Sequence, residues 1–206
     1  MGTRPDAWPT VVAATRLEAR AVRRELPAAR LVWSGVALSR LAGGAAELTG
    51  TVVTCGVAGS TRPDVPTGTV LVPRRVLRSD GCELGCDPAL VEALAAASRR
   101  LGLEPELGAM ATTEALAVGA ERAVWAARGC AGMDMETGLL RADRVASVRV
   151  VLDTPERELH AAWGRPATVL WRPAAWGQLP WLATEGPRCA RLAARVLAAA
   201  LSGYGR

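Results

Sequence analysis

Short apolar runs that fit β-strands alternate along the chain with segments of helical periodicity, and this alternation constrains the fold more than any other feature. Strand-like runs cover Thr10 to Ala14, Thr51 to Cys55 and Ser147 to Asp153, and a helix is expected from Asp87 to Leu101. Such alternation predicts an α/β fold, a three-layer αβα sandwich around a mixed, mainly parallel sheet. The length of 206 residues predicts a single domain over 1–206.

Local signals predict the remaining elements. Thr15 can cap a helix from Arg16 to Leu26, and Pro187 is expected to open a final helix. The segment from Gly56 to Ser60 is read as a small-residue turn whose backbone amides can approach a ligand. Further strands are predicted at 30–33, 68–73 and 106–112, and helices at 34–48, 119–127 and 136–144, while 74–86 is expected to be irregular.

The ionisable residues exclude several chemistries. All 25 basic residues are arginines, which rules out a lysine Schiff base and a Walker-type phosphate lysine. The net charge of +5 is scattered, so an anionic ligand is conceivable but nucleic acid is not expected. The one histidine, His160, lies in a polar stretch and is expected at the surface, which argues against Ser-His-Asp and Cys-His systems.

The five cysteines are odd in number and loosely spaced. Cys82 and Cys86 have no second pair, so no metal site is expected, and reduced thiols in a cytoplasmic protein are the simplest interpretation. Neither a signal peptide nor an apolar run long enough to span a membrane is recognisable. No glycine-rich dinucleotide fingerprint is present, and no organic cofactor is expected.

Three acids follow strand-like runs: Glu18, Glu136 and Asp153. Ligands of open α/β sheets bind at the carboxyl ends of strands, where these acids would meet. The alternative is that they are helix N-terminal acids favoured by the helix dipole. As ligand-binding groups they suit glycosidic bond cleavage, because one carboxylate can hold ribose hydroxyls, a carboxylic acid can protonate a leaving base, and another carboxylate can activate water.

Four stretches carry a specific resemblance to the purine nucleoside phosphorylase and nucleosidase superfamily. They are VVAATRLEAR near the start, TCGVAGSTRPDVPTGTVLVP, AGMDMETG with its Met-Glu pair, and VRVVLDT with its strand ending in Asp. The resemblance covers most of the chain and implies the nucleoside phosphorylase-like fold. The tail RPAAWGQLPWL is also similar to the branch associated with hopanoid biosynthesis.

The resemblance implies three chemical roles. Glu136 would bind the ribose 2′- and 3′-hydroxyls, with Met135 packing on the sugar. Asp153 would protonate the purine at N7, and Glu18 would activate the attacking water. No metal or organic cofactor is implied.

The resemblance also implies which residues surround the substrate. Thr113 and Glu114 fall where the family contacts the base. The wall near the nucleophile would consist of Cys55, Gly56, Ala58 and Gly59.

Some features depart from the family. Leu152 takes the place of the usual Ser before the catalytic Asp, the chain has no Phe to stack on the base, and the interval from Glu136 to Asp153 is short. Two alternatives to an enzyme therefore stay open. One is a diverged nucleoside-binding module, and the other is a scaffold protein whose acids only cap helices.

The substrate and partners are predicted less closely. The attacking nucleophile would be water, or phosphate if arginines and loop amides form an anion site. A bulky apolar 5′ group is expected on a small-molecule nucleoside because tryptophans cluster late in the chain, at Trp163, Trp171, Trp176 and Trp181. These tryptophans would otherwise pack in the core or an interface. The resemblance implies a homo-oligomer, at least a homodimer.

Overall fold

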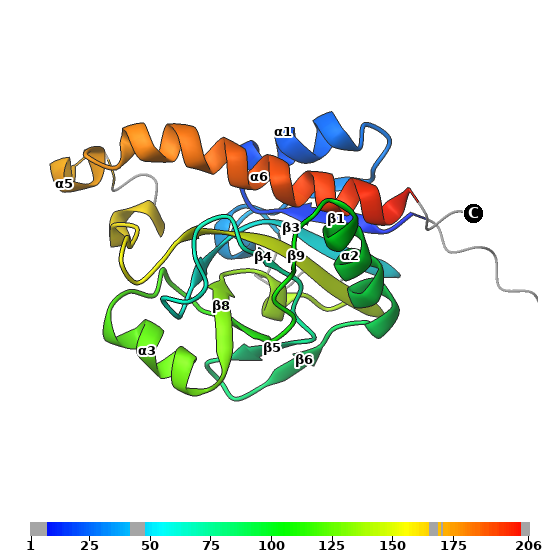
Figure 1. The fold of residues 1–206 in the computed structure, drawn as a ribbon, viewed down its shortest axis with the longest axis horizontal. Coiled ribbons are helices and arrows are strands. Elements are labelled where there is room, and N and C mark those ends of the chain that lie inside the picture. Colours follow the sequence, from blue (N-terminus) through cyan, green and yellow to red (C-terminus); the bar gives the residue numbers. More distant parts are fainter. Residues whose placement is uncertain (1–7, 42–47, 165–168, 170, 203–206) are drawn as a thin grey trace, which may run out of the picture.

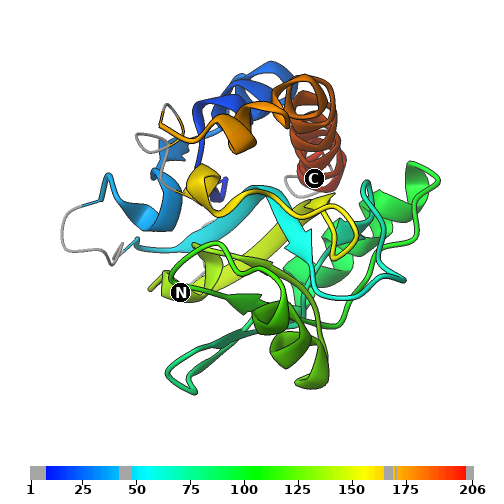
Figure 2. The same ribbon diagram turned by 90° about the vertical axis from the view of Figure 1, so that its left-hand side faces the viewer.

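A nine-stranded mixed sheet forms the centre of the computed structural model, which describes residues 8–41, 48–164, 169 and 171–202 (Figures 1 and 2). The strands are β1 (Thr10–Ala13), β2 (Leu31–Trp33), β3 (Thr51–Ser60), β4 (Val70–Leu71), β5 (Arg75–Arg78), β6 (Glu83–Gly85), β7 (Ala109–Thr112), β8 (Cys130–Asp134) and β9 (Arg144–Asp153). The helices are α1 (Arg16–Glu25), α2 (Pro88–Arg100), α3 (Ala120–Ala127), α5 (Pro173–Trp176) and α6 (Leu179–Leu201), with 3-10 turns η1 (Val36–Leu38), η3 (Thr137–Leu139) and η4 (Ala161–Gly164).

Strand β3 pairs with three other strands, β1, β8 and β9. It runs parallel to β1 at its start and parallel to β9 along its length, and its end pairs antiparallel with β8. Gly59 of β3 is thereby paired with Met133 on one side and Asp153 on the other. The carboxyl ends of β8 and β9 therefore converge on the last residues of β3.

Two helix starts were predicted from their capping residues, and both are confirmed. Thr15 and Glu18 form a reciprocal capping box at the start of α1. The Asp87 side chain accepts a hydrogen bond of 3.0 Å from the Leu90 amide at the start of α2, with Pro88 in the first turn.

Helices cover both faces of the sheet, so the predicted mixed, mainly parallel αβα sandwich is confirmed. Helices α1, α2 and α6 pack on one face, where Val22, Leu94 and Leu197 join the main core with β3 and β9. On the other side, Trp125 of α3 packs with Ala111 and other residues of β7 and β8. The division into a single domain remains a prediction.

Several predictions about local structure were wrong. The segment 56–60 is no turn but the second half of β3, and 74–86 is no irregular stretch but the antiparallel hairpin β5–β6. The last helix begins at Leu179 and includes Pro187 in its interior. The helix predicted at 136–144 is only the 3-10 turn η3, because β9 already begins at Arg144. Of the helix predicted at 34–48, only η1 is helical among the described residues, and 42–47 lie outside them.

Candidate active site

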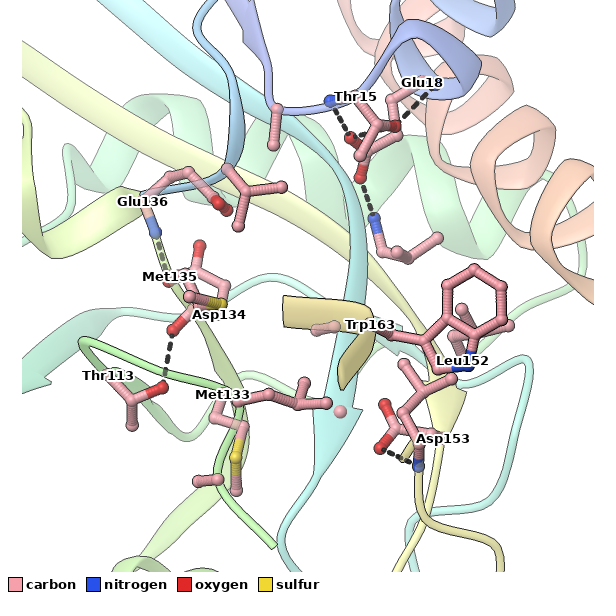
Figure 3. Close-up of a pocket in the computed structure, with 18 of the residues that line it drawn as sticks. Thr15, Glu18, Thr113, Met133, Asp134, Met135, Glu136, Leu152, Asp153 and Trp163 are labelled. Carbon is pink, nitrogen blue, oxygen red and sulfur yellow. Dashed lines mark hydrogen bonds between the residues drawn. The ribbon is translucent and has the colours of Figure 1, made fainter. Parts of the chain in front are cut away.

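A cavity opens where β8 and β9 end beside β3, and the three predicted acids all line it (Figure 3). Glu18 comes from the first turn of α1, Glu136 follows β8, and Asp153 ends β9. The remaining lining residues are mostly apolar or small: Ala14, Thr15, Val36, Val57, Ala58, Gly59, Thr113, Leu116, Ala117, Arg122, Met133, Asp134, Met135, Leu152, Leu159 and Trp163. The topology thus delivers the three predicted carboxyl groups, together with that of Asp134, to one pocket.

Both carboxylate oxygens of Glu18 accept hydrogen bonds at the cavity wall. Its Oε2 accepts hydrogen bonds from the amide and hydroxyl of Thr15 at 2.7 and 2.8 Å, and its Oε1 accepts one of 2.8 Å from the Val57 amide. The helix-cap interpretation and the pocket interpretation therefore hold together for this residue, because one side chain caps α1 and faces the cavity. These bonds fix the carboxylate against the middle of β3.

Glycines in the second half of β3 let carboxyl groups approach the strand. A Cβ at Gly56 would lie 2.0 Å from Oε1 of Glu18, and one at Gly59 would lie 3.0 Å from Oδ1 of Asp153. The small residues predicted to form a ligand-binding turn thus lie in a strand and make room for side chains.

The four wall residues expected from 55–59 divide into two groups. Ala58 and Gly59 line the cavity, whereas Cys55 and Gly56 are not among the lining residues that the structure describes. The Cys55 side chain is buried, and burial together with the charge of Glu18 raises the pKa of its thiol to about 12. A thiol in this state is inert as a nucleophile.

Beneath the cavity, the buried guanidinium of Arg149 on β9 binds several carboxylates. Its Nη2 donates to Asp134 at 2.6 Å and to Glu136 at 3.2 Å, and its Nη1 lies 3.9 Å from Glu18. Burial acts to lower the pKa of Arg149, but the three carboxylates outweigh burial and raise it. One cation therefore faces three acids, which leaves the floor of the pocket negative if all three are ionised.

Glu136 is held in place from two sides. Oε2 accepts from Arg149, and Oε1 accepts a 3.0 Å hydrogen bond from the amide of Ala37 in η1. Ala37 adopts a left-handed φ of 52°, which is unfavourable for a residue with a Cβ. Burial raises the pKa of Glu136 to about 7; Arg149 opposes this shift, while Asp134 and Glu18 reinforce it.

Asp153 forms a buried ion pair with Arg122 of α3, and each side chain is only 2 % exposed. Arg122 also donates to the carbonyl of Ser60 at 2.6 Å, and its Nε lies 3.1 Å from Oε1 of Glu158. Burial raises the pKa of Asp153 and the ion pair with Arg122 opposes the rise, so the shift is in the direction that a proton donor needs. Arg122 thus contacts the acid although the usual Ser is replaced by Leu152.

The two residues expected near the base differ in position. Thr113 is buried and lines the cavity, while Glu114 is exposed and is not among the described lining residues. Met135 lines the cavity beside Glu136, as the expected sugar contact would require. Leu116 extends this wall, and pattern reasoning did not single it out.

Of the four late tryptophans, only Trp163 lines the cavity among the described residues. It lines the cavity together with Leu152 and Asp153 (Figure 3), and its Nε1 is buried without a hydrogen-bond partner in the described part of the chain. Trp171 and Trp176 are exposed at the surface, and Trp181 is half-buried beneath the Arg157 guanidinium. Three of the four tryptophans that were expected around a 5′ group therefore lie outside the described lining of the cavity.

Three buried charged residues of the site were missed from the sequence: Asp134, Arg122 and Arg149. Asp134 accepts a 2.6 Å hydrogen bond from the Thr112 hydroxyl, and its placement one residue before Met135 was the available signal. The two arginines had no such signal, because a lone arginine in a helix or strand normally indicates an exposed position.

Within the described residues, no group of three or more His, Cys, Asp or Glu side chains is arranged to hold a metal ion. His160 lies outside the described lining of the cavity, and its Nδ1 accepts a 3.1 Å hydrogen bond from the Ala162 amide. None of the described helices is both long enough and apolar enough to span a bilayer.

Solved structures similar to this chain include nucleosidases and a hydrolase. The 5′-methylthioadenosine/S-adenosylhomocysteine nucleosidase of Helicobacter pylori matches 97 % of this chain and 99 % of its own with a TM-score of 0.68 at 13 % identity. The S-adenosylhomocysteine nucleosidase of Streptococcus pyogenes aligns over 97 % of this chain and 98 % of its own length, with a TM-score of 0.66 at 15 % identity. Futalosine hydrolase of Helicobacter pylori aligns over 94 % of this chain and 96 % of its own length, with a TM-score of 0.64 at 13 % identity.

No protein-family model matches the chain, and neither does any curated protein sequence. The likeness to the solved structures, at these identities, establishes the fold. The expected nucleoside phosphorylase and nucleosidase architecture is therefore confirmed.

Proposed function

We propose that this chain is an enzyme that cleaves the N-glycosidic bond of a purine nucleoside or an adenosyl conjugate and releases the free base. The observation that carries the proposal is the meeting of Glu18, Glu136 and Asp153 around one cavity. These three acids come from distant parts of the chain. Two of them, Glu18 and Glu136, lie within 4 Å of the same buried arginine, Arg149. The similarity of the fold to nucleosidases adds support.

Glu136 is suited to hold the ribose. Its carboxylate is oriented by Arg149 and by the Ala37 amide, and it lines the cavity next to Met135. An ionised carboxylate accepts hydrogen bonds from both ribose hydroxyls, and its charge stabilises the positive charge that develops on the sugar as the bond breaks. Asp134 and Glu18 add further negative charge nearby.

Asp153 is suited to donate the proton. A purine anion is a poor leaving group at neutral pH, so the bond breaks more readily when N7 is protonated. Burial raises the pKa of Asp153, and the residue lines the same cavity as Trp163 (Figure 3). The proton passes from the carboxyl group to N7, and the electron pair of the glycosidic bond stays with the departing base.

Water is favoured over phosphate as the nucleophile. Arg122, the arginine among the described lining residues, is already paired with Asp153, and Arg149 below the floor is paired with carboxylates. A phosphate in the cavity would face four lining acids, and the two arginines described there are already paired with carboxylates. Glu18 can instead accept a proton from a water molecule that attacks the sugar.

A catalytically diverged nucleoside-binding module is the second candidate, and the ion pair between Arg122 and Asp153 favours it. A paired guanidinium stabilises the ionised form of the acid, which cannot donate a proton. Nucleoside binding without release of base would identify this case.

The finer identity of the substrate follows from the apolar part of the wall. Leu116, Leu159 and Trp163 give the cavity an apolar lining, which suits a bulky apolar 5′ group such as the hopanoid branch would provide. A homo-oligomer and a cytoplasmic location are part of the same proposal, and light scattering at micromolar concentration tests the assembly.

Incubation with adenosine, methylthioadenosine and a 5′-alkyl adenosine, followed by chromatography of the free base, tests the function. Release of adenine from at least one compound, with a higher kcat/KM for the 5′-alkyl analogue than for adenosine, supports the proposal. Binding of a nucleoside without any released base would instead support the binding module.

A further inference from the structure

Two arginines stack on one tryptophan beside the cavity. The guanidinium carbon of Arg16, in the first turn of α1, lies 4.8 Å from the ring centroid of Trp33, and that of Arg40 lies 3.8 Å from the same centroid. Trp33 ends β2, and its Nε1 donates a 3.1 Å hydrogen bond to the carbonyl of Ala14. The indole is thus fixed in place, and it holds two positive charges at one site.

The charges of these two arginines are not balanced by acids. Arg16 and Arg40 are exposed, and in the described part of the chain neither forms an ion pair. Glu18, the acid that follows Arg16 most closely in the sequence, accepts its hydrogen bonds from Thr15 and from the Val57 amide. Because like charges repel, an anion that binds both guanidinium groups stabilises their arrangement on the ring.

A strained turn brings Arg40 back to Trp33. Ala37 and Leu38 have left-handed φ angles of 52° and 55°, which are unfavourable for residues with a Cβ. The Arg40 amide then donates a 2.8 Å hydrogen bond to the carbonyl of Ser34, the residue directly after Trp33. Backbone strain of this kind is concentrated at binding and catalytic sites, so the turn is consistent with a functional role for Arg40.

The arginine pair borders the cavity. Three residues close to it in the sequence belong to the cavity wall: Ala14, Thr15 and Val36. Thr15, which Figure 3 shows on the wall near Glu18, directly precedes Arg16. A substrate group that leaves the cavity along this wall would therefore meet the two guanidinium groups.

The 5′ group is the part of the proposed substrate that is free to leave the cavity. In the proposed reaction, Glu136 holds the 2′- and 3′-hydroxyls of the ribose, Asp153 faces the base, and water attacks the carbon that carried the base. The 5′ carbon is the remaining position at which an adenosyl conjugate carries a substituent. A long 5′ substituent can thus extend past the wall to the arginines.

We propose that Arg16 and Arg40 bind an anionic group, a carboxylate or a phosphate ester, at the far end of the substrate's 5′ substituent. The inference rests on the proposed function, because it takes the cavity as a nucleoside site. The substituent is apolar where it crosses the cavity and charged where it emerges. Arginine suits this role, because its planar guanidinium binds carboxylate and phosphate oxygens through two parallel hydrogen bonds.

A matched pair of C-nucleoside analogues of adenosine tests the proposal. A carbon–carbon bond joins base and ribose in these analogues, so neither is cleaved during the measurement. One carries a 5′-carboxyalkylthio group and the other the corresponding primary amide, which has a similar shape and no charge. By isothermal titration calorimetry, the wild type should bind the carboxylate about tenfold more tightly than the amide. Added salt should reduce this preference, and inorganic phosphate should compete with the carboxylate but not with the amide.

Three variants separate the contributions of the arginines. Arg16→Gln and Arg40→Gln should each reduce the preference for the carboxylate about threefold and leave the Kd of the amide unchanged. Arg24→Gln removes an exposed arginine from the last turn of the same helix and should keep the preference. Circular dichroism confirms that each variant is folded.

Equal Kd values of the two analogues for the wild type would overturn the proposal, and release of base from adenosine would then leave the proposed function standing alone. A preference for the carboxylate without release of base from any nucleoside would support the arginine site and contradict the proposed enzyme. Binding of neither analogue would contradict both.

Light scattering excludes a different role for the two arginines. If Arg16→Gln combined with Arg40→Gln converted a dimer into monomers, the arginines would pair with acids of a second copy of the chain, and the proposal would be wrong. An unchanged assembly together with loss of the preference supports the anion site.

Discussion

Arg122 on α3 and Asp153 at the end of β9 form an ion pair that is almost completely withdrawn from water. One residue comes from a helix and the other from a strand, and the carbonyls of Ser60 and Ala117 bind the same guanidinium. Arg122 therefore fixes the position of the acid on which the proposed reaction depends, and it also opposes protonation of that acid. We regard Arg122 as a positioning residue.

Replacement of Arg122 should change the pH dependence of the reaction. Because Arg122 acts to lower the pKa of Asp153, Arg122→Gln should raise that pKa further. A general acid is active while protonated, so the alkaline limb of the kcat profile should move to higher pH. Arg128→Gln, which removes an exposed arginine stacked on Trp125 at the end of the same helix, is the matched control and should leave the profile in place.

The same substitution should destabilise the protein. Removing one partner from a buried ion pair leaves the other charge unpaired, at a cost of about 3–5 kcal/mol. Urea denaturation of Arg122→Gln at neutral pH measures this cost, and part of it should be recovered at lower pH, where Asp153 becomes protonated. A loss below about 1 kcal/mol would contradict the assignment of a buried pair.

Glu136 should make the free energy of unfolding depend on pH. Its pKa is raised from 4.5 to about 7 in the folded protein. The folded state therefore binds more protons than the unfolded state between these values, and stability falls as pH rises through this window. The contribution is on the order of 3 kcal/mol, present below about pH 4.5 and lost above about pH 7.

Comparison of wild type with Glu136→Gln isolates this effect. The amide cannot titrate, so the stability of the variant relative to wild type should rise between pH 5 and pH 7. Denaturant unfolding at the two pH values gives the difference. A constant difference would mean that Glu136 is ionised throughout this range.

Replacement of Gly56 even by alanine should lower both the stability and the activity of the protein. A methyl group there would lie 2.0 Å from Oε1 and 2.5 Å from Cδ of Glu18, so the carboxylate must move. We expect Gly56→Ala to cost about 1–3 kcal/mol of stability and to lower kcat about 100-fold. Gly85→Ala in β6 is the control, because nothing lies within 4 Å of a Cβ at that position.

Local sequence signals predicted those elements that depend on short-range physics. Helices α1 and α2 were found because Thr15 and Asp87 have the side chains that bind free amides at a helix start. The hairpin β5–β6 was missed although Asp80-Gly81 is a turn signal, because its strands are short and carry charged residues such as Arg75. Pro187 was taken as a helix start, but about two turns of α6 precede it.

Contacts between residues far apart in the sequence could not be predicted from local sequence signals. Gly56 and Gly59 indicate a turn in isolation, and only the positions of Glu18 and Asp153 explain why they lie within a strand. The acids themselves were found because each follows an apolar run, whereas Arg149, which binds two of them, lies in the middle of a strand among valines. A buried arginine is recognisable only once its partners are placed.

Asp153→Asn tests the central claim most directly. The substitution preserves the shape of the side chain and its ability to accept from Arg122, and it removes the proton that N7 needs. For a substrate that the wild type cleaves, kcat should fall about 100-fold or more, while the Kd for the nucleoside stays near wild type because Glu136 still holds the ribose. Release of base at a near wild-type rate by a folded Asp153→Asn variant would contradict the account.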